Sequence, residues 1–322
     1  FGVAAQNRIF YDPTKVYLPP LKADGSPFAN ASFTAARVDG YDSSSSTRNL
    51  GTLSNLNTPS INHDGNSSTP NTRFYWATLK PNNSHNCGQV SRYDIKTGGL
   101  TDAEKTNYAN WYSYYRTRIL AMRAGVGRAF AQIDASRFRV GFTTINEKGV
   151  TDGKRFLDIR DFDTGTQKTD FFNRLYGVDP DGWTPLRPAL TKAGLYYANK
   201  ISGQTDPVQY SCQRNYAMLS TDGYWNDNAE TSTYKAKRLD GGAIGNQDGG
   251  TAVPRPLRDE AGKSKSGVSN TLADIAYYYY KTDLRSPALG NCAGAVVAQD
   301  VCEDNVPDGI LRPPALAMLS DS

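Results

Sequence analysis

The pattern of hydrophobic and polar residues changes abruptly near Thr101. Before it, Asn, Ser, Thr, Gly and Pro prevail, and short extended runs such as residues 73–79 stand between turn signals. Over residues 108–133, aromatic and aliphatic side chains recur every three or four positions. This spacing predicts one helix of about thirty residues whose apolar face belongs to the core. Thr101 precedes it and Glu104 follows three positions later, which predicts a capping box at the helix start.

After this helix, the pattern predicts strands and helices in alternation. The expected elements are a strand at 137–145, a short helix at 169–176, a helix from 184, a strand at 215–220 and a helix after 269. Thr184 and Pro185 suit the cap and the first position of the second of these helices. Such alternation indicates an α/β fold with a doubly wound, mainly parallel sheet flanked by helices.

These patterns predict a single domain over residues 1–322. Residues 1–100 form a loop-rich amino-terminal segment, residues 101–225 and 268–322 form the α/β core, and residues 226–267 form a long insertion. With 38% hydrophobic residues, a chain of 322 residues can bury a substantial core. Its apolar runs are far shorter than the ~20 residues that cross a bilayer, so we expect no membrane span.

Charge and histidine content exclude several classes of protein. The 36 basic and 32 acidic side chains give a net charge of only +4 and are scattered along the chain. Nucleic-acid-binding proteins usually gather Lys and Arg on one face, so we expect no nucleic-acid partner. Only two histidines are present, His63 and His85, both in Asn- and Ser-rich sequence. We therefore assign no catalytic triad and expect a protein that is not an enzyme.

Four cysteines, Cys87, Cys212, Cys292 and Cys302, suggest two disulfides. None of them forms the Cys-x-x-Cys spacing of a zinc site. An even number of cysteines in a chain rich in Tyr, Asn and Gly is typical of a secreted protein, although four buried thiols are the alternative. Cys292 and Cys302 would close a short loop, which leaves Cys87 to pair with Cys212. Sequence alone does not separate this connectivity from the other two.

Two oxygen-bearing residues lie where a doubly wound sheet binds ligands. Asp222 directly follows the strand predicted at 215–220, and Thr184 stands at the start of a helix. Ligands of such sheets collect at the carboxyl ends of the strands, and carboxylate and hydroxyl oxygens suit Mg²⁺, Mn²⁺ or Ca²⁺. The alternative is that Thr184 only caps its helix and Asp222 only makes a turn. Trp183 and Trp225, near them in sequence, are either walls of this site or parts of the core.

Several long blocks of sequence, in a fixed order, resemble the PilY/PilC family of type IV pilus tip proteins. They are Asn-Arg-Ile-Phe-Tyr-Asp-Pro at 7–13, Tyr-Leu-Pro-Pro at 17–20, Asn-Trp-Tyr-Ser-Tyr-Tyr-Arg-Thr-Arg at 110–118, Gly-Trp-Thr-Pro-Leu-Arg at 182–187, Cys-Gln-Arg-Asn-Tyr at 212–216, Ser-Thr-Asp-Gly-Tyr-Trp-Asn at 220–226, and residues 269–284. The resemblance implies a von Willebrand factor A-like domain at the amino end of a larger, extracellular pilus-tip adhesin. It implies roles in pilus assembly, attachment and twitching motility. The implied partners are minor pilins, a host or abiotic surface ligand, and the carboxyl-terminal domain of the adhesin.

The resemblance also implies a metal-ion-dependent adhesion site. Such sites combine an Asp-x-Ser-x-Ser loop after the first strand with a Thr and an Asp from two later loops; here Thr184 and Asp222 take the later roles. No Asp-x-Ser-x-Ser motif precedes residues 7–13. Residues 313–322 instead resemble the family's first strand, so Asp321 and Ser322 would supply the first loop, unless this segment is a frayed tail. Mg²⁺ is the favoured ion, with Ca²⁺ or Mn²⁺ as alternatives.

A site of this kind has few carboxylates and leaves one coordination position open to an acidic group of a partner. The leading interpretation is therefore a binding module. A metal-free structural module of the pilus tip is the second interpretation. A metal-assisted hydrolase is the third, and it would need more carboxylates and histidines than this sequence offers near the metal.

Overall fold

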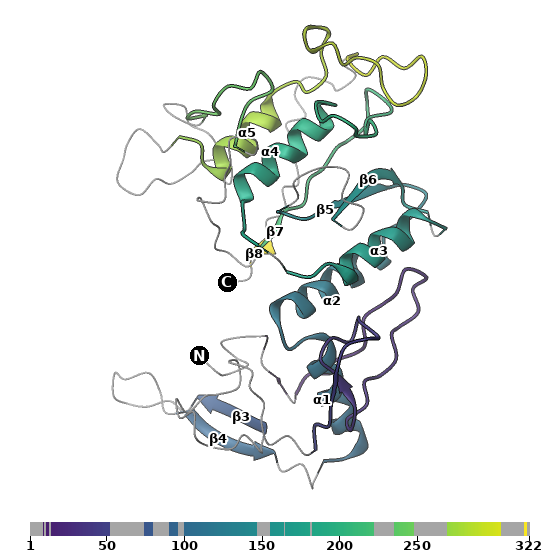
Figure 1. The fold of residues 1–322 in the computed structure, drawn as a ribbon, viewed down its shortest axis with the longest axis vertical. Coiled ribbons are helices and arrows are strands. Elements are labelled where there is room, and N and C mark those ends of the chain that lie inside the picture. Colours follow the sequence, from purple (N-terminus) through teal and green to yellow (C-terminus); the bar gives the residue numbers. More distant parts are fainter. Residues whose placement is uncertain are drawn as a thin grey trace. The chain divides into compact units, whose positions relative to one another are not determined.

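The computed structural model describes residues 9, 11–12, 14–51, 74–79, 90–95, 100–146, 155–163, 165–180, 182–221, 235–247, 269–303 and 319–320 (Figure 1). The chain divides into two compact units. The first unit comprises Phe1–Phe138 and Phe162–Val178, and the second comprises Arg139–Asp161 and Asp179–Ser322. No helix in the described part of the chain is long and apolar enough to cross a membrane.

Three helices form the frame of the first unit: α1 (Asp102–Tyr114), α2 (Arg118–Ala131) and α3 (Gln167–Gly177). The capping box of α1 is confirmed, because the Thr101 hydroxyl accepts the Glu104 amide and the Glu104 carboxylate accepts the Thr101 amide at 2.7 Å. The short helix predicted at 169–176 is confirmed as α3. The aromatic stripe of α1 is core as predicted, since Tyr108 and Trp111 are each only 4% exposed.

The prediction of one helix of about thirty residues is wrong, because the structure has two helices with a break at 115–117. Thr117 is extended and its hydroxyl accepts the Leu120 amide, so it starts a new helix as an N-cap. The buried Arg116 side chain donates to the carbonyls of Tyr112 and Val38. Carbonyls near the end of a helix lack intrahelical partners, so this guanidinium stabilises the break.

Loops and small antiparallel sheets complete the first unit. β1 (Ala36–Arg37) pairs with β2 (Thr47–Arg48), and β3 (Phe74–Leu79) pairs with β4 (Val90–Ile95). β3 confirms the extended run predicted at 73–79. Asn110 of α1 holds the loops against the helix, because its amide donates to the Tyr17 carbonyl at 2.9 Å and its oxygen accepts the Ala31 amide at 2.8 Å.

The second unit contains two helices that pack on each other, α4 (Leu186–Tyr197) and α5 (Leu272–Lys281) (Figure 1). Gly194 lets them approach closely, since a Cβ there would lie 2.2 Å from the Tyr279 ring. Leu190, Ile244 and Ile275 form the core beside this contact. Thr271 and Asp274 form a capping box at α5, which confirms the helix predicted after residue 269.

Short strands make up the described sheets of the second unit. β5 (Arg139–Thr143) confirms the strand predicted at 137–145 and pairs antiparallel with β6 (Phe156–Asp161), which the sequence pattern did not predict. β7 (Ser220–Thr221) pairs in parallel with β8 (Leu319–Ser320). Within the described residues, only the last position of the strand predicted at 215–220 lies in a ladder. The doubly wound, mainly parallel sheet stays a prediction.

Candidate functional site

Thr184 lies in a turn whose backbone requires glycine. Gly182 has φ +75°, and a Cβ at this position would lie 2.3 Å from the Asn146 amide nitrogen. Trp183 is 63% exposed and therefore not part of the core, whereas Leu186 is 1% exposed and anchors the start of α4. The half-buried Thr184 thus stands between an exposed aromatic side chain and a fixed helix.

The predicted capping role of Thr184 is wrong by one residue. Pro185 is the N-cap of α4, and this helix has no side-chain cap hydrogen bond. The ψ of Pro185 is +77°, so the proline lies outside the helix and not at its first position. The Thr184 carbonyl accepts the Leu186 amide at 3.1 Å.

The parallel pairing of β7 with β8 brings together two segments that are distant in sequence. In the register of this pair, Ser220 is the partner of Leu319, and Thr221 is the partner of Ser320. In sequence, Asp222 follows β7 directly and Asp321 follows β8 directly. Asp222, Asp321, Ser322 and Trp225 lie outside the described residues, as do both histidines.

A tyrosine at the end of α4 contacts the segment that leads to β7. The Tyr197 hydroxyl donates to the Tyr216 carbonyl at 2.7 Å. Burial raises the pKa of Tyr197 to about 12. The hydroxyl therefore stays protonated and able to donate at neutral pH. Tyr216 and Met218 of the same segment expose 49% and 57% of their surfaces.

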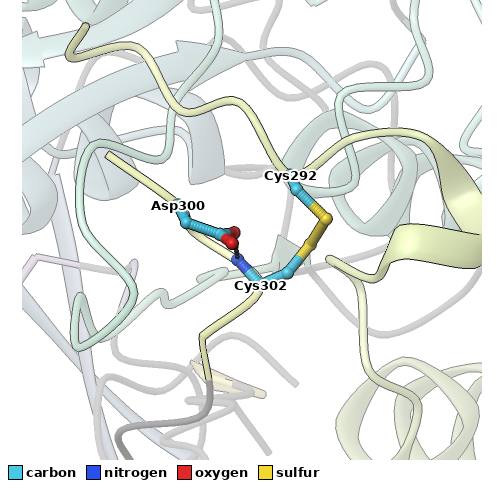
Figure 2. Close-up of side chains that lie close together, drawn as sticks. All are labelled: Cys292, Asp300 and Cys302. Carbon is cyan, nitrogen blue, oxygen red and sulfur yellow. Dashed lines mark hydrogen bonds between the residues drawn. A yellow bond between two sulfur atoms is a disulfide. The ribbon is translucent and has the colours of Figure 1, made fainter. Parts of the chain in front are cut away.

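The structure contains the disulfide predicted between Cys292 and Cys302, with a Cα–Cα distance of 5.0 Å (Figure 2). Cys212 is exposed. Its predicted partner, Cys87, lies outside the described residues, so that pairing stays a prediction.

Asp300 lies close to the disulfide, and its carboxylate accepts the Cys302 amide at 2.9 Å (Figure 2). Both sulfur atoms are bonded to each other and are not thiolates, the form in which cysteine binds metals. While the disulfide is formed, Cys292, Asp300 and Cys302 therefore do not offer the ligands of a metal site.

Sequence reasoning missed a buried ion pair beside this loop. Arg285 and Asp206, 6% and 13% exposed, are joined by two hydrogen bonds between the guanidinium and the carboxylate. They are 79 residues apart, and nothing in either local sequence distinguishes them from surface charges. Buried pairing of this kind is visible only in the structure.

Over most of its length the chain is homologous to type IV pilus biogenesis factors. One relative is PilY1 of Pseudomonas aeruginosa strain PAK, which is 30% identical over 320 residues, covering 88% of this chain and 26% of the relative. PilY1 of strain PAO1 is 34% identical over 226 residues, covering 63% of this chain and 18% of the relative. The chain thus spans about a quarter or less of the length of these curated relatives. No family model and no solved structure matches it significantly.

Proposed function

We propose that this chain is a von Willebrand factor A-like binding domain of an extracellular pilus-tip adhesin that supports pilus assembly, attachment and twitching motility. The homology to PilY1 supports the connection with the type IV pilus. The observation that carries the binding site is the parallel pairing of β7 with β8. Because the carboxyl ends of parallel strands meet at one edge of a sheet, residues that follow the two strands are expected at the same edge.

The proposed ligand set consists of oxygen atoms only. Thr184 and Ser322 would supply hydroxyls, and Asp222 and Asp321 would supply carboxylates. Such a set fits Mg²⁺ better than a soft metal, with Ca²⁺ or Mn²⁺ as alternatives. The position of Thr184 directly before the N-cap of α4 supports this assignment.

Few carboxylates at the site would leave the cation electron-poor, with one coordination position open to a further oxygen ligand. We therefore propose that an acidic side chain of a partner completes its coordination, so that the site binds and does not catalyse. The proposed partners are minor pilins, a host or abiotic surface ligand, and the carboxyl-terminal domain of the same adhesin. The exposed Trp183 would offer such a partner an apolar contact beside the metal.

Calorimetric titration with Mg²⁺, Mn²⁺ and Ca²⁺ tests the site. We expect binding to the unmodified chain and its loss in Asp222→Ala. Asp24→Ala is the matched control, because it removes an exposed carboxylate of the first unit that bonds only locally, to Ser26. Absence of binding at millimolar metal, or equal loss in both variants, would contradict the metal site. The incomplete first motif would then favour the metal-free structural tip module.

A further inference from the structure

Residues 292–302, here called the disulfide loop, form a small structure of their own. The Cys292–Cys302 bond closes it, and the Val301 amide donates to the Cys292 carbonyl at 2.9 Å. Ala293 and Asp300 form an isolated bridge farther along. Ala298 adopts φ +66°, a conformation that residues other than glycine seldom keep unless their surroundings hold them there. Closure by the disulfide supplies such a constraint.

The disulfide loop packs against residues 208–209. The Ala295 amide donates to the Val208 carbonyl at 2.8 Å, and Val208 is only 4% exposed. Gly294 makes this close approach feasible, because a Cβ there would lie 2.5 Å from the Val301 side chain and 3.2 Å from the Val208 oxygen. The contact therefore depends on the closed shape of the loop.

Arg285 and Asn291 fix the base of the disulfide loop to the same region. Arg285 donates to the Asp206 carboxylate at 2.9 Å and to the Tyr197 carbonyl at 2.7 Å. The Asn291 amide donates to the Ala198 carbonyl at 2.7 Å. All these acceptors belong to the end of α4 or to the segment that follows it.

The segment held in this way continues to β7. Beyond Val208, the Gln213 side chain closes a turn by accepting the Gln209 amide and donating to the Pro207 carbonyl, both at 3.0 Å. The chain then runs to Ser220 with no further regular structure. The contacts of residues 208–209 with the disulfide loop thus restrain the start of the segment that supplies β7.

We propose that the disulfide loop is a redox-sensitive switch that controls how firmly residues 206–221 are held. Both cysteines are half-buried and lie on a loop whose tip residue, Val297, is 93% exposed, so a small dithiol can reach them. One thiolate of the dithiol attacks a loop sulfur and forms a mixed disulfide. Its second thiol then releases the protein, which leaves two cysteine thiols and an oxidised cyclic dithiol.

Hydrogen exchange measured by mass spectrometry tests the switch, using dithiothreitol as the dithiol. The chain carries Cys87→Ser and Cys212→Ser, so that the loop disulfide is the bond that reacts. On reduction we expect amides of residues 206–221 to exchange about tenfold faster or more, while those of α4 and α5 change less than about twofold. Acceleration confined to residues 292–302, or equal acceleration of all elements, would overturn the proposal.

A second variant separates the contact from the bond. Gly294→Val keeps both cysteines but places a branched side chain against Val208 and Val301, so we expect the same acceleration without reductant. Val297→Ala, at the exposed tip, is the matched control and should exchange like the parent chain. Unchanged exchange of residues 206–221 in Gly294→Val would contradict the role of this contact.

The consequence for metal binding rests on the function proposed above. If Asp222 holds Mg²⁺, reduction should weaken calorimetric Mg²⁺ affinity at least about threefold, because Asp222 directly follows β7 in sequence. Absence of Mg²⁺ binding in both redox states, together with faster exchange of residues 206–221, would refute the metal site and support the switch. Unchanged exchange and unchanged affinity would refute the switch and support the metal site.

Discussion

The buried pair of Arg285 and Asp206 gives the sharpest prediction of stability. In Asp206→Asn, the side chain keeps its shape but loses its charge, and the new amide directs donors at a guanidinium that is itself a donor. The Arg285 side chain is 6% exposed, so water does not readily replace the lost carboxylate. Removing one partner of a buried ion pair typically costs about 3–5 kcal/mol. We expect a loss in this range from the free energy of unfolding of the second unit.

Arg285→Met tests the same contact from its other side. Asp206 would keep two neutral donors, the Asn199 amide at 3.1 Å and the Val208 backbone amide at 2.9 Å. The substitution also removes the donors to the Tyr197 and Asn291 carbonyls, so we expect a loss of the same order as in Asp206→Asn. The double variant removes both charges, so its loss should fall short of the sum by about 2 kcal/mol, within the usual range for residues in contact.

Urea unfolding followed by circular dichroism measures all three variants. Lys105→Met is the control, because the Lys105–Asp102 pair is exposed, with side chains 36% and 100% accessible. That substitution should cost less than about 0.5 kcal/mol. If Asp206→Asn cost as little as the control, or if the two losses simply added, the pair would not behave as buried and coupled, and our reasoning would be refuted.

Three further predictions concern a cap, a turn and a hydroxyl. Thr117→Ala removes the N-cap of α2 and should lower the free energy of unfolding of the first unit by about 1 kcal/mol, measured in urea, with no loss as the contrary result. Gly182→Ala places a Cβ against Asn146 at φ +75° and should cost at least about 1 kcal/mol; an unchanged melting temperature would contradict the need for glycine. Because the pKa of Tyr197 is raised, its neutral form favours folding below about pH 10, and this contribution is lost as pH rises toward about 12. Tyr197→Phe should therefore lose less stability between about pH 9 and about pH 11.5 than the parent chain, and an identical loss would contradict the assignment.

Local sequence chemistry predicted the start of α1, but not where long patterns are interrupted. The capping box at Thr101 depends on residues three positions apart, so it can be read directly from the sequence. The apolar spacing, in contrast, continues across the break between α1 and α2. What ends α1 is the combination of the Thr117 cap with the contact of Arg116 to the Val38 carbonyl. That contact joins residues 78 positions apart and has no local signature.

β6 was missed for a related reason. Its six residues, Phe156–Asp161, include three charged side chains, which weaken the hydrophobic signal of a strand. In the structure, Asp158 accepts hydrogen bonds from the Tyr196 hydroxyl at 2.9 Å and from Thr205. Asp158, whose charge is more typical of a loop than of a strand, is thus held in β6 by hydrogen bonds from residues later in the chain.

In the candidate site, too, some features could be proposed from the sequence and others could not. Thr184 and Asp222 were proposed from their places at a helix start and after a predicted strand, and the resemblance between sequence blocks then gave them roles. Cys292 was paired with Cys302 because of their short separation. The contact of the disulfide loop with Val208 could not be predicted, because it depends on backbone amides and on the absence of a side chain at Gly294. Contacts between backbone atoms depend little on residue type, so the sequence does not reveal them.

α4 connects the proposed metal edge with the proposed switch. Thr184 precedes the helix, while the carbonyls of Tyr197 and Ala198 at its end accept hydrogen bonds from Arg285 and Asn291. Its 12 residues span roughly 18 Å, so coupling between the two sites would pass through the helix or through the segment that leads to β7. Such coupling is reciprocal: if reduction of the disulfide weakens Mg²⁺ binding by some factor, saturating Mg²⁺ must favour the oxidised loop by the same factor. Redox titration with mixtures of reduced and oxidised dithiothreitol, with and without Mg²⁺, measures this factor. A midpoint that Mg²⁺ leaves unchanged, in a chain that binds Mg²⁺, would show that the two sites are independent.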